Sequence, residues 1–590
     1  MGKYMPNIYI YIYCIIWLLL LGLQNLGFWE FLRRKTDTQA VFLPGATAVI
    51  QISLLFFAGI LNLLPQATAL LWAFGIGFFF YCWWKDKGLS FLRNYISFPY
   101  LYLFLFSVIF LVFLHGKKLA HIDNFSHWSV VVKAILQKNR FPNFLEERYL
   151  EFQEYPVGSA IYIYYCMRFS GTPSSEWKMM FSQSYLYLAF LLPIFRKNSK
   201  KQMPVFLLMV LFTNFVMVFL VSITELLVDR LLVLAGMCML WYIIEHSGAE
   251  KLTPSSFLIT AAFLVANSQI KNSSVFFVAI ACVLILWAGK ADKQWVKRFS
   301  LGGIAVLAYV VWNRHCKLVY SAPDYSSHAM NASRYISILS QRNAGEILTL
   351  AKEMFLFVVE NSKTWMFVVS ILVTGTIVFL GDRQKFPTYR RQACIVTVCL
   401  LAYLLGTLAM YVVSMSTIEI ENLASIERYY STIILAAMCW VCYCFSSVLD
   451  GFDWEKYRKM EIAISLCILV FFPFLQAAFK IQGIFVPKNQ TYTYEMREPM
   501  DRTLALIGDN YPNENYTFIN PDRDLYYYLL MRYLCPESSI RFISSEKPID
   551  EQGIDTYYCI VLDWDSDYVR QWVQEGKYVR VGDWLMERAE

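Results

Sequence analysis

The sequence predicts an all-α polytopic membrane protein with about 14 transmembrane helices and a small extracytoplasmic α/β domain at its C-terminal end. Of the 590 residues, 57% are hydrophobic and 16% are charged, whereas charged residues make up roughly 25% of an ordinary soluble domain. The mean hydropathy is +0.43, and many apolar runs approach the ~20 residues that a helix needs to cross a ~30 Å hydrocarbon core. The composition becomes polar only after Phe485.

The composition excludes a disordered, fibrous or nucleic-acid-binding protein. The net charge of +7 comes from Lys and Arg residues in short loops between apolar runs, and such residues orient a membrane protein rather than bind nucleic acid. The lipid bilayer is therefore the expected partner, and no nucleic acid is expected. Most of the 14 cysteines lie inside apolar runs, and their spacing matches no metal site.

Fourteen expected spans account for the apolar runs. The first run begins at Asn7 and has no small-residue cleavage site before Arg33, so we expect a retained span rather than a signal peptide. The expected spans cover residues 7–28, 40–64, 67–84, 97–115, 179–195, 203–223, 227–245, 255–270, 274–289, 299–315, 364–380, 393–414, 429–447 and 461–478. They divide the chain into N-terminal transmembrane helices at 1–96, a transmembrane core at 97–480 with outer loops 116–178 and 316–363, and an α/β domain at 481–590.

Basic residues assign the two sides of the membrane. The loops after the odd-numbered spans contain 22 Lys and Arg residues, whereas the short loops on the other side contribute only Lys271 and Arg428. Because basic loops stay in the cytoplasm, we expect the odd-numbered exits to be cytoplasmic. We therefore expect a multi-pass cell-membrane protein whose two ends, outer loops and active site all lie on the extracytoplasmic face.

Two segments outside the spans are expected to have structure of their own. Residues 155–169 are apolar enough to enter the membrane interface, and we expect a juxtamembrane or re-entrant helix at the bilayer surface, with Pro156 in its first turn. In the C-terminal domain, strand-like runs at 516–519, 540–543 and 557–562 alternate with helical stretches at 524–534 and 566–574. This alternation predicts a small α/β fold.

The first outer loop holds the candidate for catalysis. Asp123 follows the fourth span, where its carboxylate can take a proton from an acceptor hydroxyl as a general base. A helix cap is the competing interpretation, since Asn124 or Ser126 can begin a helix here. His121 and His127 flank Asp123, but their spacing fits no metal motif. We therefore expect no metal site, although a divalent cation is compatible with the loop.

Other side chains near the outer loops can contact an acceptor or a sugar. These candidates are His127, Glu154, Tyr155, Glu225, Asp229 and Tyr429. A solvated acid beside a helix start is the alternative for Glu154. Glu225 and Asp229 lie where the sixth and seventh spans meet, and charges so close to hydrocarbon indicate either a site or mutual pairing, such as Asp229 with Arg230.

Two cations can bind the phosphate of a lipid carrier. Lys271 occupies a tight outer turn, where snorkelling toward lipid headgroups is the alternative. Arg428 begins the thirteenth span and is the sole basic residue of its loop. Its planar guanidinium suits a phosphate, and an ion pair with Glu421 or Glu427 is the competing explanation.

Taken in order, these features resemble the GT-C class of integral membrane glycosyltransferases, the protein-mannosyltransferase-like superfamily, over about residues 97–450. The resemblance rests on the acid between His121 and Trp128, the Tyr-Pro-x-Gly stretch at 155–158, the turns at Asp229 and Lys271, and Arg428 before a late span. It implies an inverting transferase whose donor is a polyprenyl-phosphate-linked sugar. Asp123 then acts as base or positions the acceptor, while Arg428 and Lys271 hold the carrier phosphate.

Two features depart from that class. Many relatives have paired acids in the first outer loop, where this chain has Asp123 followed by Asn124. Three spans also precede the span that leads into this loop, where relatives often have one.

We therefore expect transfer of a sugar from a polyprenyl-phosphate donor to an extracytoplasmic glycan or lipid-linked acceptor, such as a cell-surface or cell-wall polysaccharide. A transporter or flippase of lipid-linked glycan is one alternative, and it predicts inverted repeats and charges at mid-span. A polysaccharide polymerase or ligase is another alternative, because it would share the large outer loop.

Overall fold

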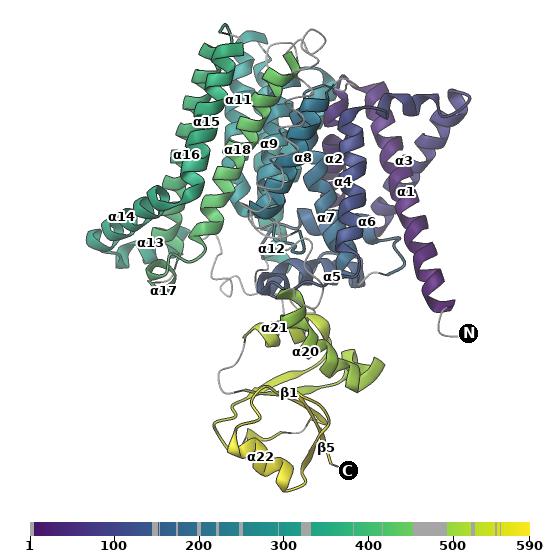
Figure 1. Cartoon of the computed structure of the whole chain (residues 1–590), viewed down its shortest axis with the longest axis vertical. Helices are drawn as coiled ribbons and strands as arrows, with labels where there is room; N and C mark the ends of the chain where they lie inside the picture. The colour runs from purple at the N-terminus through teal and green to yellow at the C-terminus, as the bar shows by residue number, and fades with distance from the viewer. Residues whose placement is uncertain are drawn as a thin grey trace.

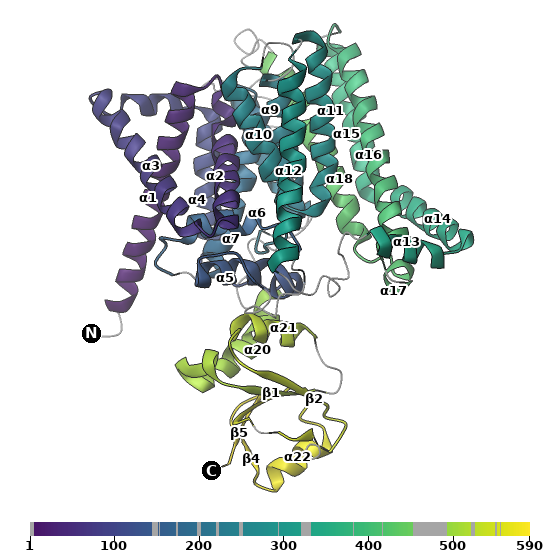
Figure 2. The same cartoon turned by 180° about the vertical axis from the view of Figure 1, so that it is seen from behind.

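The computed structural model describes residues 5–143, 152, 154–172, 175–197, 202–219, 223–246, 252–292, 294–319, 332–381, 383–415, 417–451, 492–520, 525–548, 552–554 and 556–589. Helices make up most of these residues, and a small sheet lies near the C-terminal end. Figures 1 and 2 show a bundle of long helices with a separate, smaller domain at one end. The helical class expected from the sequence is confirmed at this coarse level.

Seven helices are long and apolar enough to cross a membrane, among the residues that the structure describes. They lie within α1 (Met5–Lys35), η1 (Ala40–Phe42) continued by α2 (Leu43–Ile60), α3 (Leu64–Lys85), α12 (Trp295–Val319), α15 (Ser362–Gly381), α16 (Phe386–Ser414) and α18 (Ile426–Gly451). Several of these helices expose apolar side chains on the outside of the bundle, among them Leu70, Leu372 and Leu405. Such a surface suits contact with lipid rather than water.

Six further helices occupy expected spans but are shorter or more polar. They are α4 (Phe98–Leu114), α7 (Glu176–Leu191), α8 (Met203–Phe219), α9 (Asp229–His246), α10 (Pro254–Ser268) and α11 (Val275–Asp292). Each of the first thirteen expected spans thus contains a helix, and over the described residues seven of these helices are long and apolar enough for a membrane crossing. The fourteenth expected span, 461–478, lies outside the described residues.

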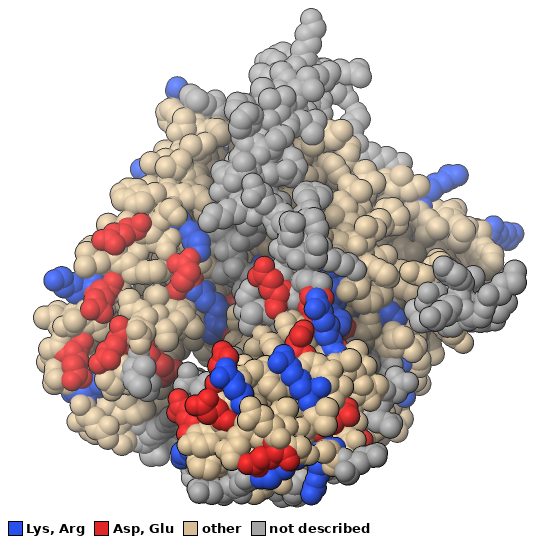
Figure 3. Space-filling view, turned by 60° about the horizontal axis from the view of Figure 1, so that its bottom comes forward, with Lys and Arg blue, Asp and Glu red and all other residues tan. Residues whose placement is uncertain are grey.

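The loops after the odd-numbered spans meet at one end of the bundle. Asp37 accepts hydrogen bonds from Thr253 and Ser255, and Lys197 lies 2.9 Å from Asp450. The C-terminal domain, α5 (Ser129–Lys138), α13 (Ala332–Gln341), α14 (Ala344–Glu360) and α17 (Thr417–Glu421) lie at the other end (Figures 1 and 2). The segments after the first, fifth, seventh and thirteenth expected spans therefore lie together, as the expected alternation requires. Acidic and basic side chains gather on the face that carries the C-terminal domain (Figure 3).

The segment after the first loop differs from its expectation. Helix α6 spans Gly158–Met167, so Pro156 precedes the helix rather than opening it. All ten of its residues are buried, and α2, α5 and α7 pack around it. Neighbouring helices cover every side of this apolar segment, so it is not the exposed surface helix of a juxtamembrane arrangement, while a re-entrant position stays a prediction.

The C-terminal domain is a five-stranded sheet with helices, in the order β2-β1-β3-β5-β4. Strands β1 (Tyr516–Ile519), β2 (Ile540–Ile543) and β3 (Tyr558–Val561) are parallel, whereas β5 (Leu585–Arg588) runs antiparallel to β3 and to β4 (Tyr578–Arg580). Helices α21 (Leu525–Leu534) and α22 (Asp567–Gln574) connect strands. These elements confirm the α/β expectation, while α20 (Tyr492–Ile507), β4 and β5 were not anticipated.

Candidate functional site

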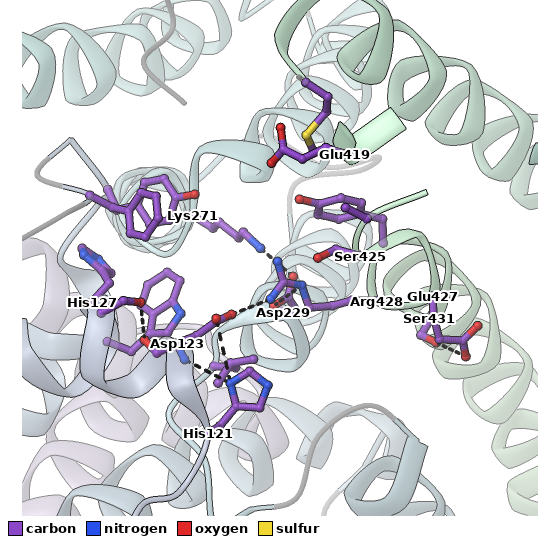
Figure 4. A pocket seen from close by; sticks show the side chains of 18 of the residues that line it. His121, Asp123, His127, Asp229, Lys271, Glu419, Ser425, Glu427, Arg428 and Ser431 are labelled. Atoms are coloured by element: carbon purple, nitrogen blue, oxygen red, sulfur yellow. Dashed lines mark hydrogen bonds and ion pairs between the residues drawn. The ribbon is translucent and has the colours of Figure 1, made fainter. Parts of the chain in front are cut away.

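A cavity of about 550 Å³ opens at the end of the bundle that carries the C-terminal domain. Its lining comes from the first loop, the start of α9, the turn before α11, and the residues around the N-terminal ends of α15 and α18. Figure 4 shows Asp123, Asp229, Lys271 and Arg428 turned toward one another there. These four residues, three of which the sequence assigned to base or phosphate contact, therefore share one site.

Asp123 directs its carboxylate across the cavity rather than onto its own helix. Its Oδ2 accepts a hydrogen bond from the Arg428 guanidinium at 2.7 Å. Asp123 occupies the cap position before η3 (Asn124–Trp128), a single π-helical turn, yet its side chain makes no capping hydrogen bond. Such turns often occur at functional sites. The helix-cap interpretation of Asp123 is wrong, because its carboxylate is engaged by a cation from a distant helix.

Asp229 lies between the two cations. Lys271 Nζ donates to Asp229 Oδ1 at 2.6 Å, and Arg428 Nε lies 3.8 Å from Asp229 Oδ2. Asp229 is 3% exposed, so this carboxylate is paired within the protein. Asp123, Arg428, Asp229 and Lys271 thus form a row of alternating charges. Lys271 does not snorkel toward headgroups, because its ammonium is held by Asp229.

The other pairings suggested by the sequence do not form. Arg230 donates to the carbonyl of Met217 at 3.1 Å and lies over the ring of Tyr187. Adjacent helical residues point in different directions, so Asp229 and Arg230 do not face each other. Glu427 pairs instead with Lys363, whose ammonium also donates to Ser431 at 2.6 Å. Arg428 is therefore paired with Asp123 and Asp229, and the competing explanation, an ion pair with Glu421 or Glu427, is not the arrangement that the described residues show.

Aromatic side chains of the first loop form one wall of the cavity. The rings of Trp128 and Tyr155 lie 5.7 Å apart, and His127 contacts both edge-on. Burial lowers the pKa of His127 to about 3, so its imidazole stays neutral near pH 7. Tyr429 lies under both cations, 5.8 Å from Lys271 and 5.6 Å from Arg428. A wall of this kind suits the apolar face of a sugar ring.

Glu225 holds the first loop through hydrogen bonds and does not line the cavity. It is 8% exposed, and its carboxylate accepts hydrogen bonds from the Asn124 side chain and from the backbone N–H of His121. The Asn124 side-chain oxygen in turn accepts from the backbone of Leu226. Burial raises the pKa of Glu225 to about 8. The expectation that Glu225 contacts an acceptor is therefore replaced by a role in holding the loop.

The Tyr-Pro-x-Gly stretch and the Lys271 turn are in direct contact. The backbone N–H of Gly158 donates to the carbonyl of Gln269 at 2.6 Å, and a Cβ at position 158 would lie 2.5 Å from that oxygen. Only glycine allows the two backbones to approach so closely. Glu154 does not line the cavity, and its carbonyl accepts a hydrogen bond from Trp312 at 2.9 Å.

Several lining residues were missed by the sequence reasoning. They include Lys363, Met415, Glu419, Ser425 and Ser431. Lys363 and Ser431 lie near the N-terminal ends of α15 and α18, and the other three lie between the end of α16 and the start of α18. No motif in the sequence marks them. No group of three or more His, Cys, Asp or Glu residues that could hold a metal ion occurs among the described residues.

Comparisons with protein-family models, with curated proteins and with solved structures found no match to the chain. The function is therefore argued from the cavity and its side chains.

Proposed function

We propose that the chain is a membrane glycosyltransferase that moves a sugar from a polyprenyl-phosphate donor to a glycan or lipid-linked acceptor. The observation that carries this proposal is the meeting of Asp123 and Arg428 at 2.7 Å in one cavity. A transferase of this kind needs a base for the acceptor and a cation for the departing phosphate within a few ångströms of each other. The aromatic wall of Trp128 and Tyr155 supports a sugar as the transferred group.

The proposed reaction uses Asp123 as general base. The acceptor hydroxyl oxygen attacks the anomeric carbon of the sugar, and its proton passes to the Asp123 carboxylate. The bond from the anomeric carbon to the phosphate oxygen breaks, and its electron pair leaves with the phosphate. A single displacement of this kind inverts the configuration at the anomeric carbon.

Arg428 and Lys271 stabilise the departing phosphate in this proposal. The guanidinium of Arg428 can bind two phosphate oxygens at once, and Lys271 adds a second positive charge 2.6 Å from Asp229. Because Asp123 occupies Arg428 at 2.7 Å, a bound phosphate competes with Asp123 for the guanidinium. Donor binding thus releases the carboxylate to act as base.

The position of the cavity suits a lipid-linked donor. Arg428 and Lys363 lie at the N-terminal ends of α18 and α15, two of the helices long and apolar enough to cross a membrane. A headgroup held there leaves the lipid chain beside apolar helix surfaces. In the full proposal the chain has fourteen spans in the cell membrane, with the cavity and C-terminal domain on the extracytoplasmic face.

The test is sugar transfer by purified protein in vesicles, with a radiolabelled polyprenyl-phosphate sugar and a glycan acceptor. Label in the glycan supports the transferase, whereas label that crosses the vesicle without covalent change supports a flippase. Extension of one glycan by lipid-linked repeat units supports a polymerase. D123N should abolish transfer, while D565N, at an acid whose side chain is 95% exposed, should not. Equal turnover by D123N and wild type would refute the assignment.

A further inference from the structure

The C-terminal domain docks directly on the segment that carries Asp123. Helix α21 packs against η3 of the first loop, and α20 lies beside it (Figures 1 and 2). The ring of Phe125 lies 5.7 Å from Tyr526 and 5.4 Å from Tyr533. Lys133 donates to the carbonyl of Tyr533 at 2.5 Å. The contact therefore combines packed aromatic rings with a hydrogen bond to the backbone.

Arg497 of α20 is the charged centre of this contact. It is 2% exposed, and its guanidinium donates to the backbone carbonyl of Leu119 at 2.8 Å. Both NH groups also lie near the Glu176 carboxylate, at 3.3 and 3.4 Å, and the guanidinium lies over the ring of Phe125. A buried cation is tolerated only with its charge and hydrogen-bond partners in place. The position of Arg497 is therefore tied to the position of Leu119.

Leu119 is held at both of its backbone groups. Its N–H donates to Glu176 at 2.7 Å, and its carbonyl accepts from Arg497. Two residues later the N–H of His121 donates to Glu225 at 3.3 Å. The backbone from 119 to 124 is thus fixed by groups from α7, from the turn before α9 and from the C-terminal domain.

Asp123 depends on this fixed backbone because its carboxylate must point into the cavity, where it meets Arg428 in this structure and would meet the acceptor hydroxyl in the proposed reaction. Arg497 does not line the cavity, so it cannot contact a substrate there. Its contacts reach the cavity through the first loop, at Leu119, four residues before Asp123, and at Phe125, two residues after it. Displacing a base by about 1 Å can cost on the order of 100-fold in rate, so a contact outside the cavity can control turnover.

We propose that Arg497 is a positioning residue for sugar transfer, which makes the reaction depend on docking of the C-terminal domain. This role rests on the proposed function of Asp123. Arg497 fixes Leu119 and Glu176, these fix the loop, and the loop aims the Asp123 carboxylate. Arg428 and Lys271 hold the donor phosphate without help from Arg497.

The test compares R497M, R497K and R502Q in the full-length protein, with turnover scaled to folded protein. Arg502 lies on the same helix, its side chain is 64% exposed and it pairs with Glu498, so R502Q is a matched control. We expect R497M to lower kcat by on the order of 10- to 100-fold with the donor KM unchanged. R497K keeps the positive charge but loses the several N–H donors of the guanidinium. Its kcat should therefore lie between those of R497M and wild type. R502Q should behave as wild type.

Hydrogen–deuterium exchange of residues 119–128 separates positioning from general loss of structure. We expect faster exchange there in R497M, with exchange in α9 and α18 unchanged. If R497M fails to fold, R497K and E176Q test the same contacts.

Unchanged kcat in folded R497M, or an equal loss in R502Q, would overturn the proposal. If the wild-type protein itself transfers no sugar, the proposed function fails separately. Hydrogen–deuterium exchange at 119–128 in R497M then decides whether Arg497 fixes the loop. Exchange equal to that of wild type would overturn the positioning role as well.

Discussion

The Arg428 guanidinium lies 2.7 Å from the Asp123 carboxylate, although 305 positions separate the two residues in the chain. Asp123 belongs to the first loop and Arg428 to the start of α18. The two can meet only if the fourth and thirteenth expected spans have their outer ends on the same side of the bundle. The ion pair therefore agrees with the expected order of the spans and brings two of the expected site residues together.

This ion pair predicts opposite effects of D123N on binding and on turnover. Both side chains are partly exposed, 26% for Arg428 and 34% for Asp123, and pairs of this kind contribute about 0.2–1 kcal/mol. Removing the carboxylate frees Arg428 for phosphate, so a non-hydrolysable polyprenyl-phosphate analogue should bind up to about fivefold more tightly. Microscale thermophoresis in detergent measures this affinity. Weaker binding by D123N would mean that Asp123 holds the ligand rather than competing with it.

The Lys271–Asp229 pair predicts that folding stability and activity can be separated. Lys271 and Asp229 side chains are 13% and 4% exposed, and breaking such a buried pair costs at most about 3–5 kcal/mol. K271M leaves Asp229 with Arg428 alone, and it should lower the melting temperature. K271M combined with D229N should recover part of that loss, because it removes the buried carboxylate that K271M leaves with Arg428 alone, but it should not recover donor binding. Additive melting-temperature losses in the double variant would show that the pair is not coupled.

The elements of the fold followed largely from apolar periodicity. Runs of apolar residues placed thirteen helices, and the strands at 516–519 and 540–543 have the bounds that alternation and turn residues predicted. The number of crossings did not follow equally well. The expected span 227–245, for example, includes Asp229, which lies in the first turn of α9. The apolar part of that helix is therefore shorter than the expected span.

Three residues of the site could be predicted from their residue type and their position in the expected outer loops, but the ion pairs between them could not. Lys271 and Arg428 were identified because they are the only basic residues of the short loops expected on the outer side, and Asp123 because it follows the fourth expected span. Which acid meets which cation depends on how α9, α11 and α18 pack, and no local pattern encodes that. Glu225 shows the limit: its sequence position resembles that of Asp229, yet it faces the loop while Asp229 faces the cavity. The contacts of Arg497 were equally invisible, since they join segments 378 positions apart.

The contact between Gly158 and Gln269 predicts that G158A displaces the Lys271 turn. The new Cβ would lie 2.5 Å from the Gln269 carbonyl oxygen, and overpacking of this kind costs about 1–3 kcal/mol. G302A is the control, because a Cβ at that helical glycine meets nothing within 4 Å. We expect G158A to melt at lower temperature and to raise the donor KM, while G302A leaves both near wild type. A KM unchanged in G158A would separate the turn from donor binding.

Glu225 predicts a pH dependence of stability that E225Q should remove. Its pKa is raised from 4.5 to about 8, first by burial and then by the nearby carboxylates of Asp123 and Glu176. Between these two pH values the folded protein keeps a proton that the unfolded chain has released. The stabilisation from this group is therefore full below pH 4.5 and declines by about 1.4 kcal/mol per pH unit toward pH 8.

The E225Q variant tests this pH dependence, because glutamine keeps an acceptor for Asn124 and His121 but does not titrate. The melting temperature of E225Q relative to wild type should therefore rise from pH 5 to pH 8 and level off above it. E537Q, at an acid whose side chain is 71% exposed, should show a constant difference. Parallel curves for E225Q and wild type would mean that Glu225 is ionised beneath the loop.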